Sequence, residues 1–181
     1  MIIYFIGFRG AGKSTLAKAM TEKMKSKAAQ FLDCDEIFES RNGMRILEWI
    51  EKHGETSFRE KECEVLKSLP ALCKNTAEKK IHFIATGGGF VDFPKSYAFL
   101  AQQSSPRIFI DCSAQQLWER LKTSPDRLKV GNITDFSGFQ ALYNARLPKY
   151  KSLATHTLVS GGTGVHEDIR KIEAFFDFDK H

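Results

Sequence analysis

Short apolar runs recur along the chain, and each of them ends at a glycine or a polar residue. The first run, Ile2–Ile6, ends at Gly7. The others are residues 30–32 before Asp33, 81–85 before Thr86, 107–110 before Asp111 and 156–159 before Ser160. Continuous apolar runs of this length are typical of strands that are buried on both faces of a parallel sheet. The pattern therefore predicts five short strands.

Segments with helical periodicity lie between these runs. Residues 14–27 carry apolar side chains three and four positions apart, which favours a helix. Similar segments cover residues 46–53, 57–72, 114–122, 136–151 and 165–176. Alternation of this kind predicts an α/β three-layer sandwich, in which helices cover both faces of a parallel sheet. The length of 181 residues suits one domain, so we expect residues 1–181 to form a single domain.

A phosphate-binding loop follows the first predicted strand. Residues Gly7–Ser14 match the pattern G-x-x-x-x-G-K-[ST] in full, between a strand and a helix as that pattern requires. In such a loop, backbone N–H groups and the positive end of the helix dipole form a cradle for phosphates. We expect Lys13 to reach the β- and γ-phosphates and Ser14 to ligate Mg²⁺, so the implied cofactor is ATP with Mg²⁺. The nucleotide-binding residues are then Gly10, Ala11, Gly12, Lys13, Ser14 and Thr15.

Two carboxylates stand at the end of the second predicted strand. Asp33 and Asp35 alternate there, and ligands collect at the carboxyl ends of strands in parallel sheets. One carboxylate could therefore face the metal ion while the other faces the hydroxyl group of a phosphate acceptor. The alternative is that either residue simply caps the next helix.

Three glycines and two arginines are further candidates for the acceptor site. Gly87–Gly89 directly follow a buried strand, which favours close approach of the backbone to a ligand over a merely flexible turn. Arg59 and Arg146 could each present a planar fork that suits a carboxylate, although each taken alone could be a surface arginine. Residues 123–135 are polar and lack periodicity, so we expect them to form a lid loop.

The composition excludes several other classes of protein. The net charge is +5, but the basic residues are spread among acids and no aromatic-basic motif accompanies them, so nucleic acid is not expected as a partner. The four cysteines have no C-x-x-C spacing and predict neither a zinc site nor a disulfide framework. The apolar start at residues 1–8 is too short to span a membrane and lacks the features of a signal peptide. We therefore expect a cytoplasmic protein without a membrane partner.

Five motifs taken together resemble the shikimate kinase family. They are G-F-R-G-A-G-K-S-T at 7–15, D-C-D at 33–35, G-E-T-S-F-R-E-K-E at 54–62, T-G-G-G at 86–89 and R-L-P-K-Y at 146–150. Their order and spacing agree with the family as well, and the resemblance weakens beyond about residue 150. It implies a sheet with strand order 2-3-1-4-5, of the nucleoside-monophosphate-kinase type, and ATP-dependent phosphorylation of the 3-hydroxyl of shikimate.

The resemblance also assigns roles to individual residues. Asp35 would hold the acceptor hydroxyl and assist its deprotonation, and Asp33 would help to place Mg²⁺. Arg59 and Arg146 would bind the carboxylate of shikimate, and the glycines Gly87, Gly88 and Gly89 would belong to the substrate-binding site. Arg127 resembles the lid arginine that closes on the transferred phosphate, so the implied catalytic residues are Lys13, Asp35 and Arg127. We expect a monomer that acts on a small molecule.

Departures from the family pattern keep other functions open. Arg9 stands where the family usually has Met, residues 128–130 are Leu-Lys-Val where Pro-Leu-Leu is typical, and residues 160–162 replace an acidic pattern near the adenine. The alternatives are a gluconate-type sugar-acid kinase and a nucleotide-binding homologue with impaired catalysis. A regulatory GTPase fits less well, because its two partial motifs would overlap at Asp135.

Overall fold

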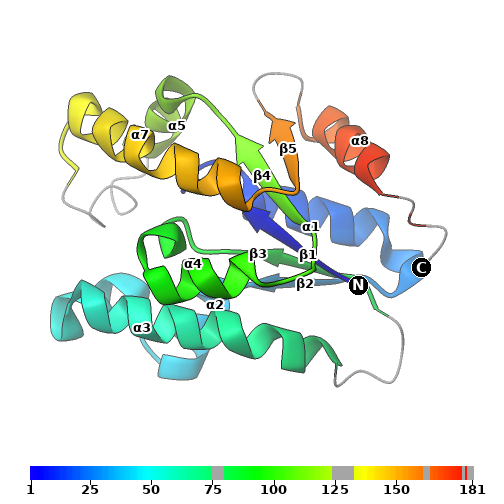
Figure 1. The fold of residues 1–181 in the computed structure, drawn as a ribbon, viewed down its shortest axis with the longest axis horizontal. Coiled ribbons are helices and arrows are strands. Elements are labelled where there is room, and N and C mark those ends of the chain that lie inside the picture. Colours follow the sequence, from blue (N-terminus) through cyan, green and yellow to red (C-terminus); the bar gives the residue numbers. More distant parts are fainter. Residues whose placement is uncertain (75–79, 124–132, 161–163, 177, 179–181) are drawn as a thin grey trace.

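The computed structural model describes residues 1–74, 80–123, 133–160, 164–176 and 178. Its centre is a parallel sheet of five strands in the order β2-β3-β1-β4-β5, so the expected strand order is confirmed. The strands are β1 (Ile2–Ile6), β2 (Gln30–Asp33), β3 (His82–Ala85), β4 (Arg107–Asp111) and β5 (His156–Val159). The predicted three-layer architecture is also confirmed, because helices cover both faces of this sheet (Figure 1).

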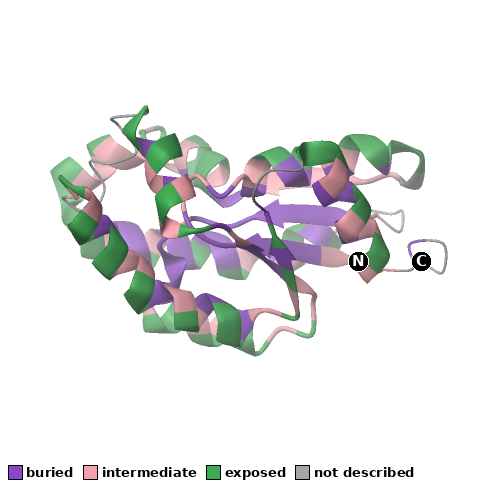
Figure 2. Cartoon of the chain, turned by 90° about the horizontal axis from the view of Figure 1, so that it is seen from above, coloured by how far each residue is buried: buried purple, intermediate pink, exposed green. Residues whose placement is uncertain are grey.

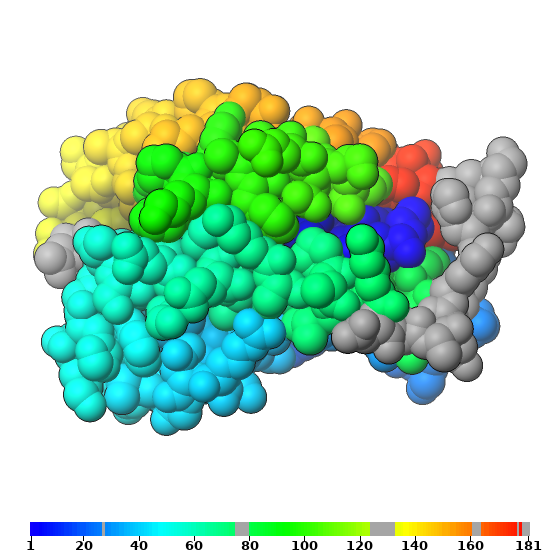
Figure 3. All heavy atoms as spheres, turned by 60° about the horizontal axis from the view of Figure 1, so that its bottom comes forward, coloured from blue at the N-terminus to red at the C-terminus, as the bar shows by residue number. Residues whose placement is uncertain are grey.

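Helices α1 and α8 pack on one face of the sheet, and α3, α4 and α7 pack on the other. Figure 3 shows α3 and α4 side by side on the surface. The α-helices are α1 (Lys13–Lys23), α2 (Cys34–Asn42), α3 (Ile46–Lys74), α4 (Pro94–Ala101), α5 (Ala114–Lys122), α7 (Phe136–Leu153) and α8 (Val165–Phe175). The 3₁₀ helices are η1 (Lys25–Lys27) and η2 (Phe90–Asp92). No helix in the described part of the chain has the length and apolar character needed to cross a bilayer.

The strands of the sheet centre have almost no contact with solvent (Figure 2). Residues 3–6 of β1 are 0% exposed, since β3 and β4 flank this strand and helices cover both of its faces. This burial explains why β1 is a continuous apolar run rather than an alternating one. Burying each large apolar side chain contributes about 2 kcal/mol, so the central strands provide a rigid base for the loops at their carboxyl ends.

The two helices predicted at 46–53 and 57–72 form one helical run, α3, which is interrupted at Gly54. Gly54 has φ 82° and ψ 161°, a conformation that glycine adopts without steric cost. Two other helices, α2 and α4, were not predicted. Both are short, and α2 follows β2 without a loop, so that only its caps, Asp33 and the left-handed Gly43, mark it in the sequence.

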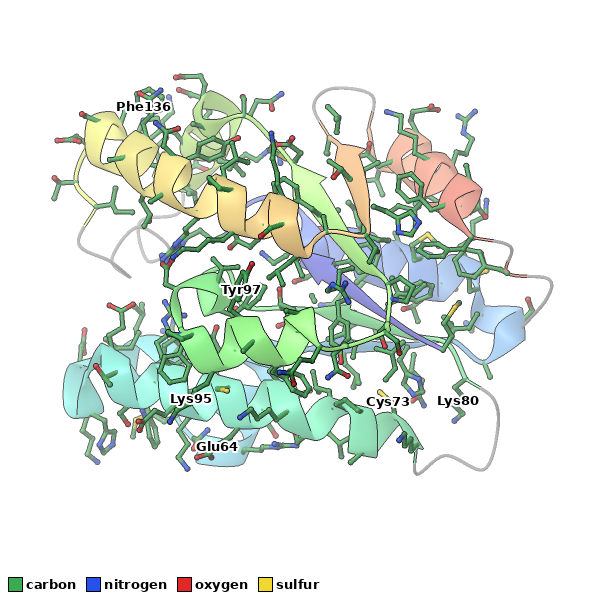
Figure 4. The ribbon with its side chains drawn as sticks, in the orientation of Figure 1. Glu64, Cys73, Lys80, Lys95, Tyr97 and Phe136 are labelled. Carbon is green, nitrogen blue, oxygen red and sulfur yellow. The ribbon has the colours of Figure 1, made fainter. Side chains whose placement is uncertain are left out.

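Aromatic packing attaches α7 to the phosphate-binding loop. The ring of Phe8 lies 4.9 Å from that of Tyr143 and 5.2 Å from that of Tyr150. Tyr150 also stacks on Phe109 of β4, with ring centroids 5.5 Å apart. Near the C-terminal end of α7, Tyr97 points from α4 toward this helix (Figure 4), and its hydroxyl lies 2.8 Å from Ser152 Oγ. The loop, β4 and α7 are therefore held together as one unit.

Candidate active site

The phosphate-binding loop owes its shape to glycine at three positions. Gly7, Gly10 and Gly12 have φ angles of 141°, 79° and 96°, which side chains rarely allow. Gly12 precedes α1 directly, and no side chain caps this helix. The N–H groups of the first turn of α1 thus remain available for an anion, and the dipole of α1 adds to their attraction.

Lys13 and Ser14 extend from this loop toward neighbouring groups. The buried Lys13 donates from Nζ to the carbonyl oxygen of Phe8 at 2.8 Å, which holds its positive charge over the loop. Ser14 donates from Oγ to Asp33 Oδ2 at 2.6 Å. The predicted metal-binding pair, Ser14 and Asp33, is therefore in direct contact.

Asp33 also caps α2, which was the alternative interpretation of this residue. Its Oδ1 accepts a hydrogen bond from the backbone N–H of Asp35 at 2.9 Å, while Oδ2 faces Ser14. The two interpretations are compatible because they use different oxygens. A hydroxyl and one carboxylate suit Mg²⁺, which keeps several waters and phosphate oxygens as its other ligands. The described residues contain no cluster of three or more His, Cys, Asp or Glu side chains placed to hold a metal.

Asp35 faces the cavity in front of the phosphate-binding loop. It is solvent-exposed as a residue, yet segment 87–89 partly desolvates its carboxylate, because a Cβ atom at Gly87 would lie only 3.1 Å from Asp35 Oδ1. This desolvation, followed by the negative charges of Glu62 and Asp33, raises the pKa of Asp35 to about 7, although Lys13 and Arg59 act in the opposite direction. Such a carboxylate is poised to exchange a proton near neutral pH.

Arg59 lies in the part of α3 that follows the interruption at Gly54, and it is held on three sides. Its Nη1 donates to Glu62 Oε2 at 2.8 Å and its Nη2 donates to Glu55 Oε1 at 3.0 Å. The guanidinium also lies 4.9 Å from the ring centre of Phe58. These contacts fix the fork of Arg59 along the wall of the cavity, as the sequence-based assignment to carboxylate binding requires.

Glu62 is a site residue that sequence reasoning missed. It is 4% exposed and lines the same cavity, and its Oε1 has no hydrogen-bond partner among the residues that the structure describes. Burial raises the pKa of Glu62, while the charges of Arg59, Arg146 and Arg9 oppose the shift. Its sequence signals were its place at the end of the motif at 54–62, where no role was assigned to it, and its spacing of three residues from Arg59, which on a helix brings the two side chains together.

The three consecutive glycines are required by neighbouring protein groups. A Cβ atom at Gly87 would overlap Glu62 Oε1, and one at Gly88 would lie 2.7 Å from the backbone nitrogen of Arg9. A Cβ atom at Gly89 would lie 2.7 Å from Arg59 Cζ. The segment 87–89 is thus pressed between the acidic and basic side chains of the site. Gly88 and Gly89 line the cavity, and Gly87 packs behind it.

Arg146 lies behind the glycine segment instead of along the cavity. It is 5% exposed, donates from Nε to Asp92 Oδ2 at 2.6 Å, and approaches the carbonyl oxygen of Gly88 with Nη1 at 3.4 Å. Lys149 donates to the other oxygen of Asp92 at 2.9 Å. The structure therefore brings both predicted arginines to the glycine segment, but only Arg59 faces the open space.

Arg9 adds a third guanidinium to this region and lines the cavity. Burial lowers the pKa of Arg9 to about 10, and the positive charges of Arg146 and Arg59 contribute to the decrease. A neighbouring positive charge lowers the pKa of an arginine because it disfavours the charged form. The acceptor end of the cavity is therefore a place where a bound anion relieves repulsion.

Two hollows meet at the phosphate-binding loop. The first, of about 440 Å³, contains the acceptor end together with Lys13, Ser14 and Thr15. The second, of about 480 Å³, lies on the other side of the loop. It is lined by Gly10, Ala11, Gly12, Thr15, Leu16, Arg120, Ser160, Gly164, Val165 and Asp168. Arg127 and most of the expected lid lie outside the described residues.

A shikimate kinase family model matches residues 9–176. The chain belongs to the shikimate kinase family. Its relatives include the shikimate kinase of Aromatoleum aromaticum, 33% identical over 91% of this chain and 87% of that protein. The shikimate kinase of Lactococcus lactis is 36% identical over 87% of each chain. Family membership makes the protein a kinase, and all of the predicted site residues lie inside the matched region.

Solved structures of shikimate kinases share the fold. The enzyme from Aquifex aeolicus superimposes with a TM-score of 0.76 at 30% identity, covering 96% of this chain and 95% of the other. A shikimate kinase from Acinetobacter baumannii in complex with shikimate gives a TM-score of 0.82 at 24% identity, covering 96% of this chain and 91% of the other. A deoxyadenosine kinase with a TM-score of 0.64 has the same arrangement at 16% identity, so the fold extends beyond the family.

Proposed function

We propose that the protein transfers the γ-phosphoryl group of ATP to the 3-hydroxyl of shikimate, giving shikimate 3-phosphate and ADP. The observation that carries this proposal is the composition of one cavity. Lys13 and Ser14 of the phosphate-binding loop line it together with Asp35 and Arg59, a carboxylate and a fixed guanidinium. A donor phosphate and a hydroxylated carboxylate can thus be bound side by side, which is the arrangement that phosphoryl transfer requires.

In this proposal the donor is held around the phosphate-binding loop. The N–H groups of residues 10–15 and the Lys13 ammonium bind the phosphates, and the second hollow takes the nucleoside. Ser14 and Asp33 hold Mg²⁺, which when bound neutralises charge on the phosphate oxygens. Arg127 is proposed to approach the transferred group from the lid, where a cation stabilises the charge of the transition state.

The acceptor is held by residues from four parts of the chain. Arg59, with Arg146 behind the glycines, attracts the carboxylate, and the backbone of Gly88 and Gly89 contacts the ring, with Gly87 packed behind them. Asp35 accepts a hydrogen bond from the reacting hydroxyl and takes its proton as the phosphorus–oxygen bond forms. Its pKa of about 7 makes it both ionised enough to accept this proton and basic enough to retain it. All these groups belong to one chain, so we propose that the monomer is the active unit.

The test is ADP production by the purified protein from ATP and Mg²⁺, with shikimate, gluconate or no acceptor. We expect turnover that depends on shikimate, and ³¹P NMR of the product should show a new phosphate monoester. Turnover with gluconate but not with shikimate would show that the acceptor is a sugar acid instead of shikimate. ATP binding without turnover on any acceptor would favour the catalytically impaired homologue.

A further inference from the structure

The outer wall of the first cavity is built where α2 ends and α3 begins. Arg45, immediately before α3, lines this cavity together with Asp35 and Arg59. The start of α3 lies at the left of Figure 1, the side toward which the arrow of β1 points. Arg45 therefore borders the acceptor end of the cavity, yet none of the motifs that identify the site includes it.

The stability of α3 does not explain an arginine at this position. The residue before a helix usually accepts hydrogen bonds from the first turn, as Ser, Thr, Asp or Asn does. Here Glu48 Oε2 accepts from the N–H of Arg45 at 3.3 Å, and Glu39 Oε1 accepts from the N–H of Ile46 at 3.0 Å. A cation beside the positive end of a helix dipole is destabilising. Arg45 is thus unfavourable for the helix that it precedes.

Arg45 also differs from Arg59 and Arg146 in how its charge is paired. Arg59 forms ion pairs with two carboxylates, and Arg146 forms one with Asp92. Within the described ranges, the exposed guanidinium of Arg45 makes no hydrogen bond or ion pair. A charge that no protein group neutralises acts on the anions that enter the cavity.

We propose that Arg45 is a further specificity-determining residue for the acceptor, whose guanidinium attracts the acceptor carboxylate at the mouth of the cavity and promotes its capture. The inference rests on the proposed function, because it takes the acceptor to be a hydroxylated carboxylate. Arg45 acts on the anionic part of the acceptor and not on the reacting hydroxyl. Its contribution therefore appears in kcat/KM for the acceptor and leaves kcat nearly unchanged.

The experiment compares Arg45→Gln and Arg45→Lys with the control Arg41→Gln. Arg41 is exposed on the last turn of α2 and lies outside the cavity lining, so its variant loses the same charge elsewhere. At low salt we expect Arg45→Gln to lower kcat/KM for shikimate by about fivefold, and Arg45→Lys and Arg41→Gln by less than about twofold. At about 0.5 M salt the loss in Arg45→Gln should shrink, because the Debye length falls to a few ångströms.

A neutral analogue of shikimate, with hydroxymethyl in place of the carboxylate, separates attraction of charge from damage to the site. Arg45→Gln should handle this analogue as the wild-type protein does, and its KM for ATP should stay within about twofold. A loss of the same size on the analogue, a loss confined to ATP, or equal behaviour of Arg45→Gln and Arg41→Gln would overturn the inference. In each of those cases wild-type turnover of shikimate would leave the proposed function standing. Wild-type protein that neither binds shikimate in calorimetry nor phosphorylates it would overturn both.

Discussion

The donor and acceptor halves of the site are built in different ways. The donor half is a continuous segment, residues 7–15, in which the backbone makes the binding surface and glycines set its shape. The acceptor half collects side chains from α2, α3, the segment after β3 and α7, and these side chains neutralise one another in pairs. A site made by a local loop can be recognised in a sequence, whereas a site made by distant paired charges depends on the fold.

The largest effect should follow a change in the donor half. Lys13→Ala removes the ammonium that is held over the loop, so kcat should fall by about 1,000-fold, because this charge stabilises the transferred phosphoryl group. The matched control is Lys18→Ala, which removes an exposed lysine of α1 that pairs with Glu36 at 3.2 Å. Steady-state kinetics check both variants. If kcat of Lys13→Ala stayed within tenfold of the wild-type value, the backbone cradle would stabilise the transferred group without this lysine.

Asp35→Asn should lower kcat by about 100-fold while KM for ATP stays nearly constant. Glu36→Gln, on the exposed neighbour in α2, should retain wild-type rates. In the wild-type enzyme, kcat/KM should rise as the pH passes through about 7, where Asp35 loses its proton. A rate profile that is flat between pH 6 and pH 8 would remove Asp35 from the proton transfer.

The same titration predicts an effect of Asp35 on stability. The pKa of Asp35 is raised from 3.8 to about 7 in the folded protein, so the native state binds this proton more tightly than the unfolded state does. Stability is therefore lost as the pH rises from about 4 to above 7. Asp35→Asn escapes this loss, and thermal unfolding should show a higher Tm than wild type at pH 8 and an equal one near pH 4. A lower Tm for the variant at pH 8 would contradict the claim that the folded protein disfavours the ionised form of Asp35.

Arg59→Ala tests the paired charges of the acceptor half. It should raise KM for shikimate by about tenfold and destabilise the protein by about 3 kcal/mol, because Glu62 is left buried without its cation. Lys61→Ala, on the same helix, breaks an exposed pair with Glu64 and should cost less than about 1 kcal/mol. Denaturant unfolding and acceptor titrations measure the two effects. An Arg59 variant defective only toward ATP would assign this residue to the donor half.

The smallest effect is expected at the glycine segment. Gly87→Ala places a methyl group against Glu62 and 3.1 Å from Asp35 Oδ1, so it should cost about 2 kcal/mol and lower kcat/KM several-fold. Gly138→Ala is the control, because a Cβ there meets nothing nearer than Asp135 Oδ1 at 3.5 Å and alanine favours the helix. Equal stability of both variants would show that segment 87–89 can shift to accommodate a Cβ atom without loss of stability.

The sequence by itself determined the features that depend on neighbours along the chain. The central strands β1, β3 and β4 were visible because burial on both faces demands a continuous apolar run, whereas the edge strands β2 and β5 are only partly buried and carry shorter apolar runs. The phosphate-binding loop was visible because its glycine conformations and its helix start lie within eight residues, Gly7–Ser14. The strand order came from five motifs that resemble one family, since apolar patterns alone do not say which strands are adjacent. Helix α4 was missed because its residues 97–101 form a continuous apolar run, which shows no helical spacing of apolar and polar positions.

Only the tertiary structure decided how the charges of the site are arranged. Sequence reasoning placed Arg59 and Arg146 together as equal partners, but Asp92 holds Arg146 behind the glycine segment while Arg59 remains on the cavity. It offered two roles for Asp33, and the fold gives one to each oxygen. Glu62 has no motif of its own, and its importance comes from burial beside Arg59. The physical reason is that ion pairing and desolvation depend on distances in space, which only the packing of the helices on the sheet establishes.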